Sequence, residues 1–198
     1  MKNSLLTCLF CCLFSSPLFA YSNTLTLPWL EPMLIDDASS WATESLNEMK
    51  GLFDCGEEEG KEYCSEPVKY YKTEVESYLW VEEGQVNKVE VFSPFSPLSY
   101  SELQLNLRKD GFSLAWIKIG EKSIDVIEEL KQKPLYKVDR EVVMFMNKGS
   151  IVTPRQLIWY PKAEYYAAQH TRYVEFLSDG NTVTVRFVRG EELFVDDL

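Results

Sequence analysis

The only histidine of the chain, His170, is the first residue to consider for catalysis. A general base needs a carboxylate or a nucleophile within reach, and no Gly-x-Ser-x-Gly elbow surrounds any serine. A catalytic zinc ion normally takes two or three His or Cys ligands, which this sequence does not offer once its cysteines are paired. We therefore interpret His170 as a hydrogen-bonding loop residue, and we expect no catalytic residue, no metal and no cofactor.

The acidic residues could carry a different chemistry, because two carboxyl groups at a set separation hydrolyse glycosidic bonds. The chain has 31 Asp and Glu residues, so some pair always looks suitable, and no motif identifies one. Glu57, Glu58 and Glu59 lie in a polar segment with two glycines, which is typical of solvated charge. The Asp179-Gly180-Asn181 segment lacks the dense Asp/Asn ladder of a calcium loop.

The first 22 residues have the pattern of a cleavable export signal. A short start with Lys2 is followed by a mostly apolar run from Leu5 to Phe14, and small residues then stand at Ala20 and Ser22. The run is about half of the roughly 20 residues that span a membrane, so we expect no stable membrane anchor. Lipid attachment at Cys11 or Cys12 is disfavoured, because Phe10 and Cys11 precede them instead of the required small residues and the apolar run ahead of them is too short. The expected mature chain is a single domain over residues 23–198, located in the periplasm or secreted.

Cleavage near Ala20 to Ser22 changes both the cysteine count and the charge. It removes three of the five cysteines and leaves Cys55 and Cys64, which in an exported chain predict one disulfide. It also removes Lys2 but no acidic residue, so the net charge moves from −11 to −12. A chain this acidic is repelled by nucleic acid and by anionic membranes, and it attracts basic partners. We therefore expect no nucleic-acid partner.

Aromatic residues gather in two segments. One group contains Trp159, Tyr160, Tyr165 and Tyr166, and a second lies between residues 70 and 80. Such residues anchor protein interfaces and form platforms for sugars, but they also cover the cores of small sheets. Both interpretations stay open. The first group and the three glutamates Glu57, Glu58 and Glu59 are the candidate partner-binding residues.

The elements that position these residues indicate an α+β fold. We expect a mixed, mainly antiparallel sheet of five to seven strands with two or three helices on one face. The chain should enter as an extended segment over residues 23–34. Helices are expected over residues 39–50, 100–109 and 124–131, the second with a capping box from Ser99 to Glu102. The expected strands cover residues 78–81, 86–92, 112–119, 141–146, 156–160, 173–177 and 182–188.

The helix between the second and third of these strands suggests a crossover unit with a parallel pair. The loose likeness of the first and last hairpins leaves an internal duplication open. No low-complexity segment or long linker interrupts the pattern, in keeping with one domain.

These features favour an exported binding protein without catalytic activity. Its sharpest form is an inhibitor or immunity protein that neutralises a toxin or a lytic enzyme through protein–protein contact. A glycan-cleaving enzyme of the cell envelope that uses paired carboxylates is one alternative, and an envelope assembly or accessory protein is another. The sequence does not identify the partner or the oligomeric state.

Overall fold

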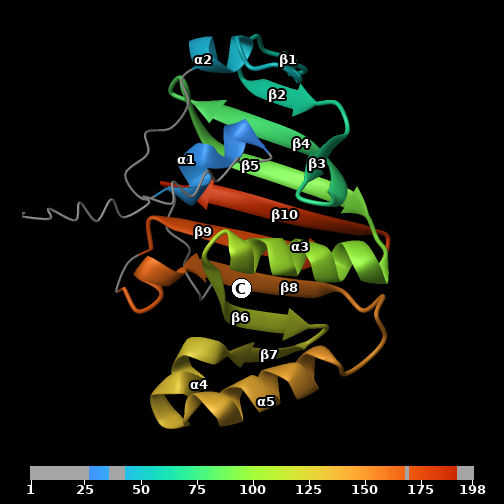
Figure 1. Ribbon diagram of the computed structural model, residues 1–198, viewed down its shortest axis with the longest axis vertical. Coiled ribbons are helices and arrows are strands. Elements are labelled where there is room, and N and C mark those ends of the chain that lie inside the picture. Colours follow the sequence, from blue (N-terminus) through green and yellow to red (C-terminus); the bar gives the residue numbers. More distant parts are fainter. Residues whose placement is uncertain (1–26, 36–42, 168–169, 191–198) are drawn as a thin grey trace, which may run out of the picture.

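The computed structural model describes residues 27–35, 43–167 and 170–190, and ten strands of this part form one antiparallel sheet (Figure 1). Their order across the sheet is β1-β2-β4-β5-β10-β9-β8-β6-β7, and β3 also pairs with β4. The strands are β1 (Leu52–Asp54), β2 (Glu62–Ser65), β3 (Val68–Tyr70), β4 (Thr73–Glu82), β5 (Gln85–Pro94), β6 (Phe112–Ile119), β7 (Lys122–Asp125), β8 (Arg155–Pro161), β9 (Arg172–Ser178) and β10 (Thr182–Arg189).

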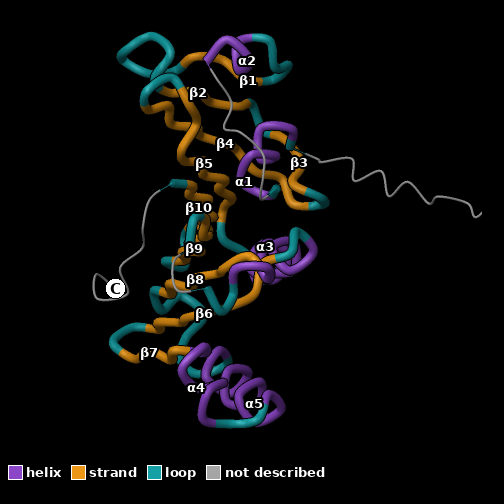
Figure 2. The backbone as a smooth tube through the Cα atoms, turned by 90° about the vertical axis from the view of Figure 1, so that its left-hand side faces the viewer, coloured by secondary structure: helices purple, strands orange, loops and turns teal. Residues whose placement is uncertain are grey.

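Helix α3 packs on one face of this sheet, and the α4–α5 pair lies at its β7 edge. Figure 2 shows α1, α3, α4 and α5 on the same side of the strands. The helices are η1 (Pro28–Leu30), α1 (Glu31–Leu34), α2 (Thr43–Asn47), α3 (Pro97–Lys109), α4 (Val126–Gln132), α5 (Leu135–Met146) and η2 (Lys162–Glu164). The main core lies between these helices and the sheet, and it includes Leu103, Phe112 and Trp159.

The α+β class and the mainly antiparallel sheet are confirmed, but the sheet is larger than expected. Ten strands replace the expected five to seven, and the described residues contain five α-helices, only some of which pack on the sheet. The additional strands are short: β1 and β3 have three residues each, and β2 and β7 have four. Segments of this length carry too few alternations to be recognised by their periodicity.

The expected parallel pair is wrong, because every strand pair in the sheet is antiparallel. Helix α3 does connect β5 to β6, but β10, β9 and β8 lie between those two strands. The helix therefore crosses three strands instead of connecting two adjacent ones. These three strands are formed by residues later in the chain.

The expected strand over residues 141–146 is also wrong, since this segment is the second half of α5. Its run of Val, Met and Phe has strand-forming composition, but the helix begins earlier, directly after Pro134. From there Val138, Val142 and Phe145 recur at helical steps, and Val138 and Phe145 are buried. The longer period overrides the local β preference of the run.

A bulge explains why the second strand of the first hairpin alternates imperfectly. Val81 pairs with Val86, whereas the preceding residue Trp80 pairs with Lys88, so Asn87 is the extra residue. This insertion returns Val86 to the core face, where it is fully buried beside Val89.

The helix boundaries differ from the expectation in ways that the caps explain. Helix α3 begins three residues early, because Ser96 is the N-cap and forms its capping box with Ser99 instead of Glu102. The cap of α4 is Asp125 and not Ser123, which belongs to β7. The entry segment is helical, not extended, over η1 and α1. The signal over residues 1–22 and part of the helix expected over 39–50 lie outside the described residues.

None of the described helices is both long and apolar enough to cross a membrane.

Candidate functional site

Charge is distributed unevenly along the sheet. Residues 44–83, here called the acidic end, hold twelve acidic residues and four lysines. Residues 84–190, here called the body, hold twelve acidic residues and fifteen Lys or Arg residues. The first segment therefore carries a net charge of −8 and the second a net charge of +3. Since the acidic end comprises β1 to β4 and α2, its charge gathers at one end of the molecule (Figure 1).

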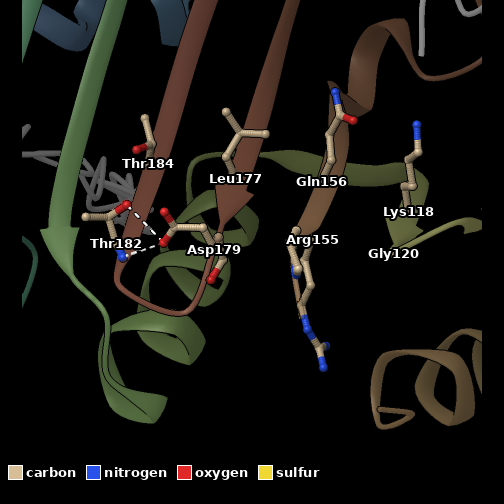
Figure 3. Close-up of a pocket in the computed structure, with 10 residues that line it drawn as sticks. Lys118, Gly120, Arg155, Gln156, Leu177, Asp179, Thr182 and Thr184 are labelled. Carbon is tan, nitrogen blue, oxygen red and sulfur yellow. Dashed lines mark hydrogen bonds between the residues drawn. The ribbon is translucent and has the colours of Figure 1, made fainter. Parts of the chain in front are cut away.

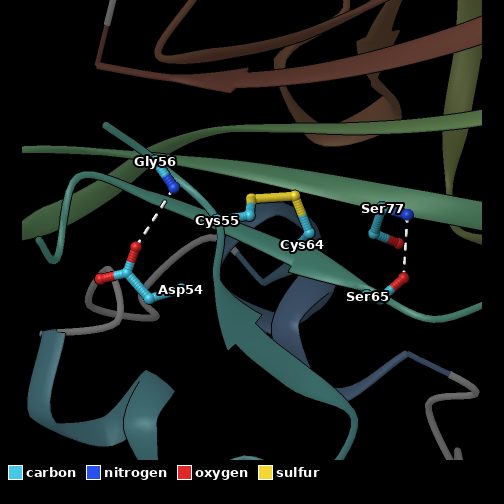
Figure 4. The surroundings of a disulfide bond; sticks show 6 residues. All are labelled: Asp54, Cys55, Gly56, Cys64, Ser65 and Ser77. Carbon is cyan, nitrogen blue, oxygen red and sulfur yellow. Dashed lines mark hydrogen bonds between the residues drawn. A yellow bond between two sulfur atoms is a disulfide. The ribbon is translucent and has the colours of Figure 1, made fainter. Parts of the chain in front are cut away.

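The three predicted glutamates lie at this acidic end, on a loop closed by the expected disulfide. Cys55 and Cys64 are bonded, with their Cα atoms 5.8 Å apart (Figure 4). Inside the loop, the Asp54 carboxylate accepts hydrogen bonds from the backbone N–H groups of Gly56 at 3.2 Å and Gly60 at 2.6 Å. The loop is thus held from both ends, while Glu57, Glu58 and Glu59 are exposed.

An aromatic surface borders the disulfide on the face of the sheet opposite α3. Tyr78 is the cross-strand partner of Cys64, and its ring stacks on Phe92 with centroids 5.3 Å apart. Trp80 follows along the same face, and the Lys88 ammonium lies 4.1 Å from its ring centroid. These aromatic rings are only partly buried, so the surface combines exposed ring area with surrounding carboxylates.

The structure places the predicted aromatic group in different environments. Trp159 is completely buried in the main core, and Tyr160 is buried on the opposite face of the sheet. Tyr165 is also buried, and its hydroxyl donates a hydrogen bond of 2.6 Å to the carbonyl oxygen of Leu114. Tyr166 is 74% exposed. Of these four side chains, only Tyr166 is free to touch a partner without rearrangement.

Three of these aromatic residues border one hollow, here called the α3–α5 groove. The groove has a volume of about 500 Å³ and lies on the helix-covered side, between α3 and the α4–α5 pair. Trp159, Tyr165 and Tyr166 line it, whereas Tyr160 does not. Arg108 of α3 lies over the Trp159 ring, 5.7 Å from its centroid. The sequence group therefore marks a real concavity, although most of its rings are walls and not free anchors.

His170 stacks flat on Tyr160, with ring centroids 3.5 Å apart and an angle of 5° between the rings. Desolvation lowers the pKa of His170 below 6.5, and the carboxylate of Glu164 opposes this shift only in part. Glu164 itself pairs with the buried Arg172 at 2.9 Å. No carboxylate or nucleophile is hydrogen-bonded to the imidazole among the described residues, so the geometry is that of a packing residue.

Asp110 is the described carboxyl group with the most unusual environment. It caps the end of α3, and the hydroxyls of Tyr70 and Tyr71 both donate hydrogen bonds to it. Burial raises the pKa of Asp110, while the two hydrogen bonds act in the opposite direction. Tyr70 is the last residue of β3, and Tyr71 lies in the turn that follows. Their hydrogen bonds to Asp110 therefore connect the β3–β4 turn of the acidic end to helix α3 of the body.

Two carboxylates on the face of the sheet opposite α3 form ion pairs with an arginine of the same chain. Glu90 of β5 and Glu175 of β9 lie on either side of β10, and both form ion pairs with Arg186, Glu90 at 2.6 Å. Gln156 donates a further hydrogen bond of 2.7 Å to Glu175. Within the described part of the chain, no group of three or more His, Cys, Asp or Glu residues could hold a metal ion.

A second hollow, of about 430 Å³, lies where β8, β9 and β10 meet the β9–β10 turn (Figure 3). Lys118, Gln156 and Thr184 border it, but the Arg155 side chain points away from them and donates to the Met146 carbonyl at 2.7 Å. Asp179 accepts hydrogen bonds from Asn181 and Thr182, each 2.8 Å long, and so closes the turn. The polar groups of this hollow mainly stabilise the strand ends.

Comparison of the chain with protein-family models, curated proteins and solved structures finds no match.

Sequence reasoning missed the residues that complete the α3–α5 groove. Arg108 and Lys162 lie on its rim, and Leu135 and Val142 of α5 form one wall. The helical spacing from Leu135 onward was a usable signal, but the strand interpretation of residues 141–146 concealed it. The two cations carried no signal of their own, because only the folded chain brings α3 and η2 together.

Proposed function

We propose that this protein is an exported binding protein without catalytic activity, which docks a basic protein against its acidic end. In its sharpest form, the proposal is that it neutralises a toxin or a lytic enzyme as an inhibitor or immunity protein does. The observation that carries the proposal is the net charge of −8 over residues 44–83, centred on a loop that a disulfide braces.

The pre-ordered loop lowers the cost of binding. A flexible loop loses conformational freedom when a partner fixes it, and that loss subtracts from affinity. Here the disulfide and the Asp54 hydrogen bonds restrict the backbone around Glu57, Glu58 and Glu59 before any partner arrives. Their carboxylates can therefore attract a cationic surface at long range and contact it with little further ordering.

The neighbouring aromatic surface gives a reason for contact beyond charge. Tyr78 pairs across the strands with Cys64, and its ring contacts the partly exposed rings of Trp80 and Phe92. Aromatic residues supply much of the binding energy in protein interfaces. Lys88 already lies over Trp80, so the ring accepts a cation in this setting. An arginine or lysine of the partner could make the same contact on Tyr78 or Phe92.

The test is capture of a partner from the source cell's exported proteins with three forms of the chain. The loop variant carries Glu57→Gln, Glu58→Gln and Glu59→Gln. The matched control carries Glu121→Gln, Glu128→Gln and Glu141→Gln, three exposed residues of the body, so both variants lose the same charge. We expect the wild type and the control to retain one basic protein in near-equal amount, and the loop variant to bind it about tenfold more weakly.

If both variants captured the partner equally well, Glu57, Glu58 and Glu59 would not contribute to binding, which would contradict the proposed role of the acidic end. Hydrolysis of glycan by the purified protein, abolished by one acid-to-amide change, would instead favour an envelope enzyme.

A further inference from the structure

The α3–α5 groove has the composition of a small-molecule site. Its volume of about 500 Å³ falls in the range of roughly 300–1,000 Å³ found for ligand pockets. The floor is apolar and includes Phe112, Leu114 and Trp159, and the walls add Leu130 and Val142 from the two helices of the α4–α5 pair. An apolar chain lying in the groove would bury its surface against these side chains and leave water.

The cationic and the anionic residues of the rim lie on different sides of the groove. Arg108 lies in the last turn of α3, and the backbone of Lys162 donates a 2.9 Å hydrogen bond to Gly111 just beyond that helix, so the two cations share one side. Neither forms an ion pair with a carboxylate in the part of the chain that the structure describes. Asp139 of α5 lies on the rim as well. An anionic head group is therefore attracted to the α3 side and repelled by Asp139.

One of the residues that line the groove carries an unpaired donor. Trp159 is completely buried, and its Nε1–H group has no hydrogen-bond acceptor among the described residues. A buried donor without an acceptor costs about 1–3 kcal/mol, which an acceptor oxygen from a ligand would recover. The exposed Arg108 side chain covers the indole ring, and it is the group that would turn toward an incoming anion.

We propose that the α3–α5 groove binds a fatty acid. The alkyl chain lies on the apolar floor, and the carboxylate faces Arg108 and Lys162 with Trp159 Nε1 as a further donor. This site is separate from the acidic end, so a test of fatty-acid binding does not depend on whether the acidic end binds a partner.

Isothermal titration calorimetry with three twelve-carbon ligands below their micelle concentrations tests the proposal. Dodecanoate carries the predicted head group, dodecan-1-ol carries no charge, and dodecyltrimethylammonium carries the opposite charge on the same chain. We expect one dodecanoate per protein, weaker binding of the alcohol and no binding of the cation. No heat from dodecanoate, or equal affinity for dodecanoate and the cation, would overturn the proposal.

Variants then locate the site, with a matched control for each. Arg108→Gln and Lys162→Gln should each weaken dodecanoate binding about tenfold, the loss expected for one charge-assisted hydrogen bond, whereas Arg140→Gln on the outer surface of α5 should not. Leu135→Asp should weaken binding, whereas Val143→Asp, equally exposed but outside the groove, should leave it unchanged.

The remaining variant addresses the indole donor. Trp159→Phe removes the Nε1–H group and keeps an aromatic ring, so it should reduce the affinity for dodecanoate more than that for dodecan-1-ol. Affinities that do not respond to Arg108, Lys162 or Leu135 would show that the ligand binds elsewhere and would overturn the assignment to this groove.

Discussion

The acidic end and the body share one sheet but are stabilised in different ways. The acidic end consists largely of short strands and exposed carboxylates, and a disulfide, the Asp54 turn and two tyrosines bonded to Asp110 hold it together. The body has longer strands, a core around Trp159 and three helices packed on or beside it. We therefore expect the body to contribute most of the stability of the fold, whereas the acidic end displays most of the net negative charge.

The largest effect should come from removing the core of the body. Trp159→Ala deletes a completely buried indole, and we expect the free energy of unfolding to fall by about 3–5 kcal/mol. The companion variant Trp80→Ala changes a partly exposed ring at the acidic end, so it should cost only about 1 kcal/mol. Urea denaturation of both proteins measures the difference, and losses of equal size would break the distinction between the two regions.

Removing the disulfide should have the next largest effect and should act on the acidic end. The double variant Cys55→Ser, Cys64→Ser loses the restriction of a short loop, and we expect about 2–3 kcal/mol of stability to be lost. Amide hydrogen exchange should accelerate first in β1 and β2 and remain slow in β8 to β10. Uniform acceleration across the sheet would show that the bond braces the whole fold and not one end.

The link between the two regions should have a smaller effect. Asp110→Ala removes the acceptor of the buried Tyr70 hydroxyl and of Tyr71, so stability should fall by about 1–3 kcal/mol. Asp110→Asn keeps a carbonyl oxygen as acceptor and should cost less. If both variants match the wild type in urea denaturation, the hydrogen bonds do not hold the acidic end to the body.

The smallest effect is the pH dependence of the contribution that His170, in the body, makes to the stability of the fold. Desolvation lowers the pKa of His170 in the folded protein below 6.5, so the unfolded chain binds a proton more readily just below that pH. The contribution of His170 is therefore complete above pH 6.5 and is lost as the pH falls through the folded-state pKa.

Comparing wild type with His170→Phe, which keeps a ring on Tyr160, isolates this contribution between about pH 7.5 and 5.5. The wild type should lose more stability than the variant over this range. Since His170 is the only histidine, its NMR titration gives the pKa directly, and a value above 6.5 would contradict the account.

Local chemistry in the sequence predicts two of the hairpins and the disulfide. The segment Ser178-Asp179-Gly180-Asn181 forms the turn between β9 and β10, and Glu83 and Gly84 turn the chain between β4 and β5. The bond between Cys55 and Cys64 follows from the cysteine count after removal of the expected signal. These features depend on residues that are close together in the sequence, so they can be predicted without knowledge of the tertiary structure.

The sequence does not reveal which distant segments meet. Helix α3 has a clear capping signal, but nothing local shows that it crosses three strands contributed by later residues. The aromatic group around Trp159 looked uniform, yet alternation along β8 sends Trp159 and Tyr160 to opposite faces of the sheet. The α3–α5 groove arises from this tertiary arrangement, so only its aromatic members could be selected beforehand.

Zero-length carbodiimide cross-linking in the source cell's exported fraction tests the central claim most directly, because it joins carboxylates to lysines that already touch them. The account predicts that the cross-links to another protein originate from Glu57, Glu58 and Glu59, and that added salt suppresses them. Cross-links that start mainly from carboxylates of the body, or that persist unchanged in the triple Glu→Gln loop variant, would contradict the proposal that the acidic end binds a basic partner.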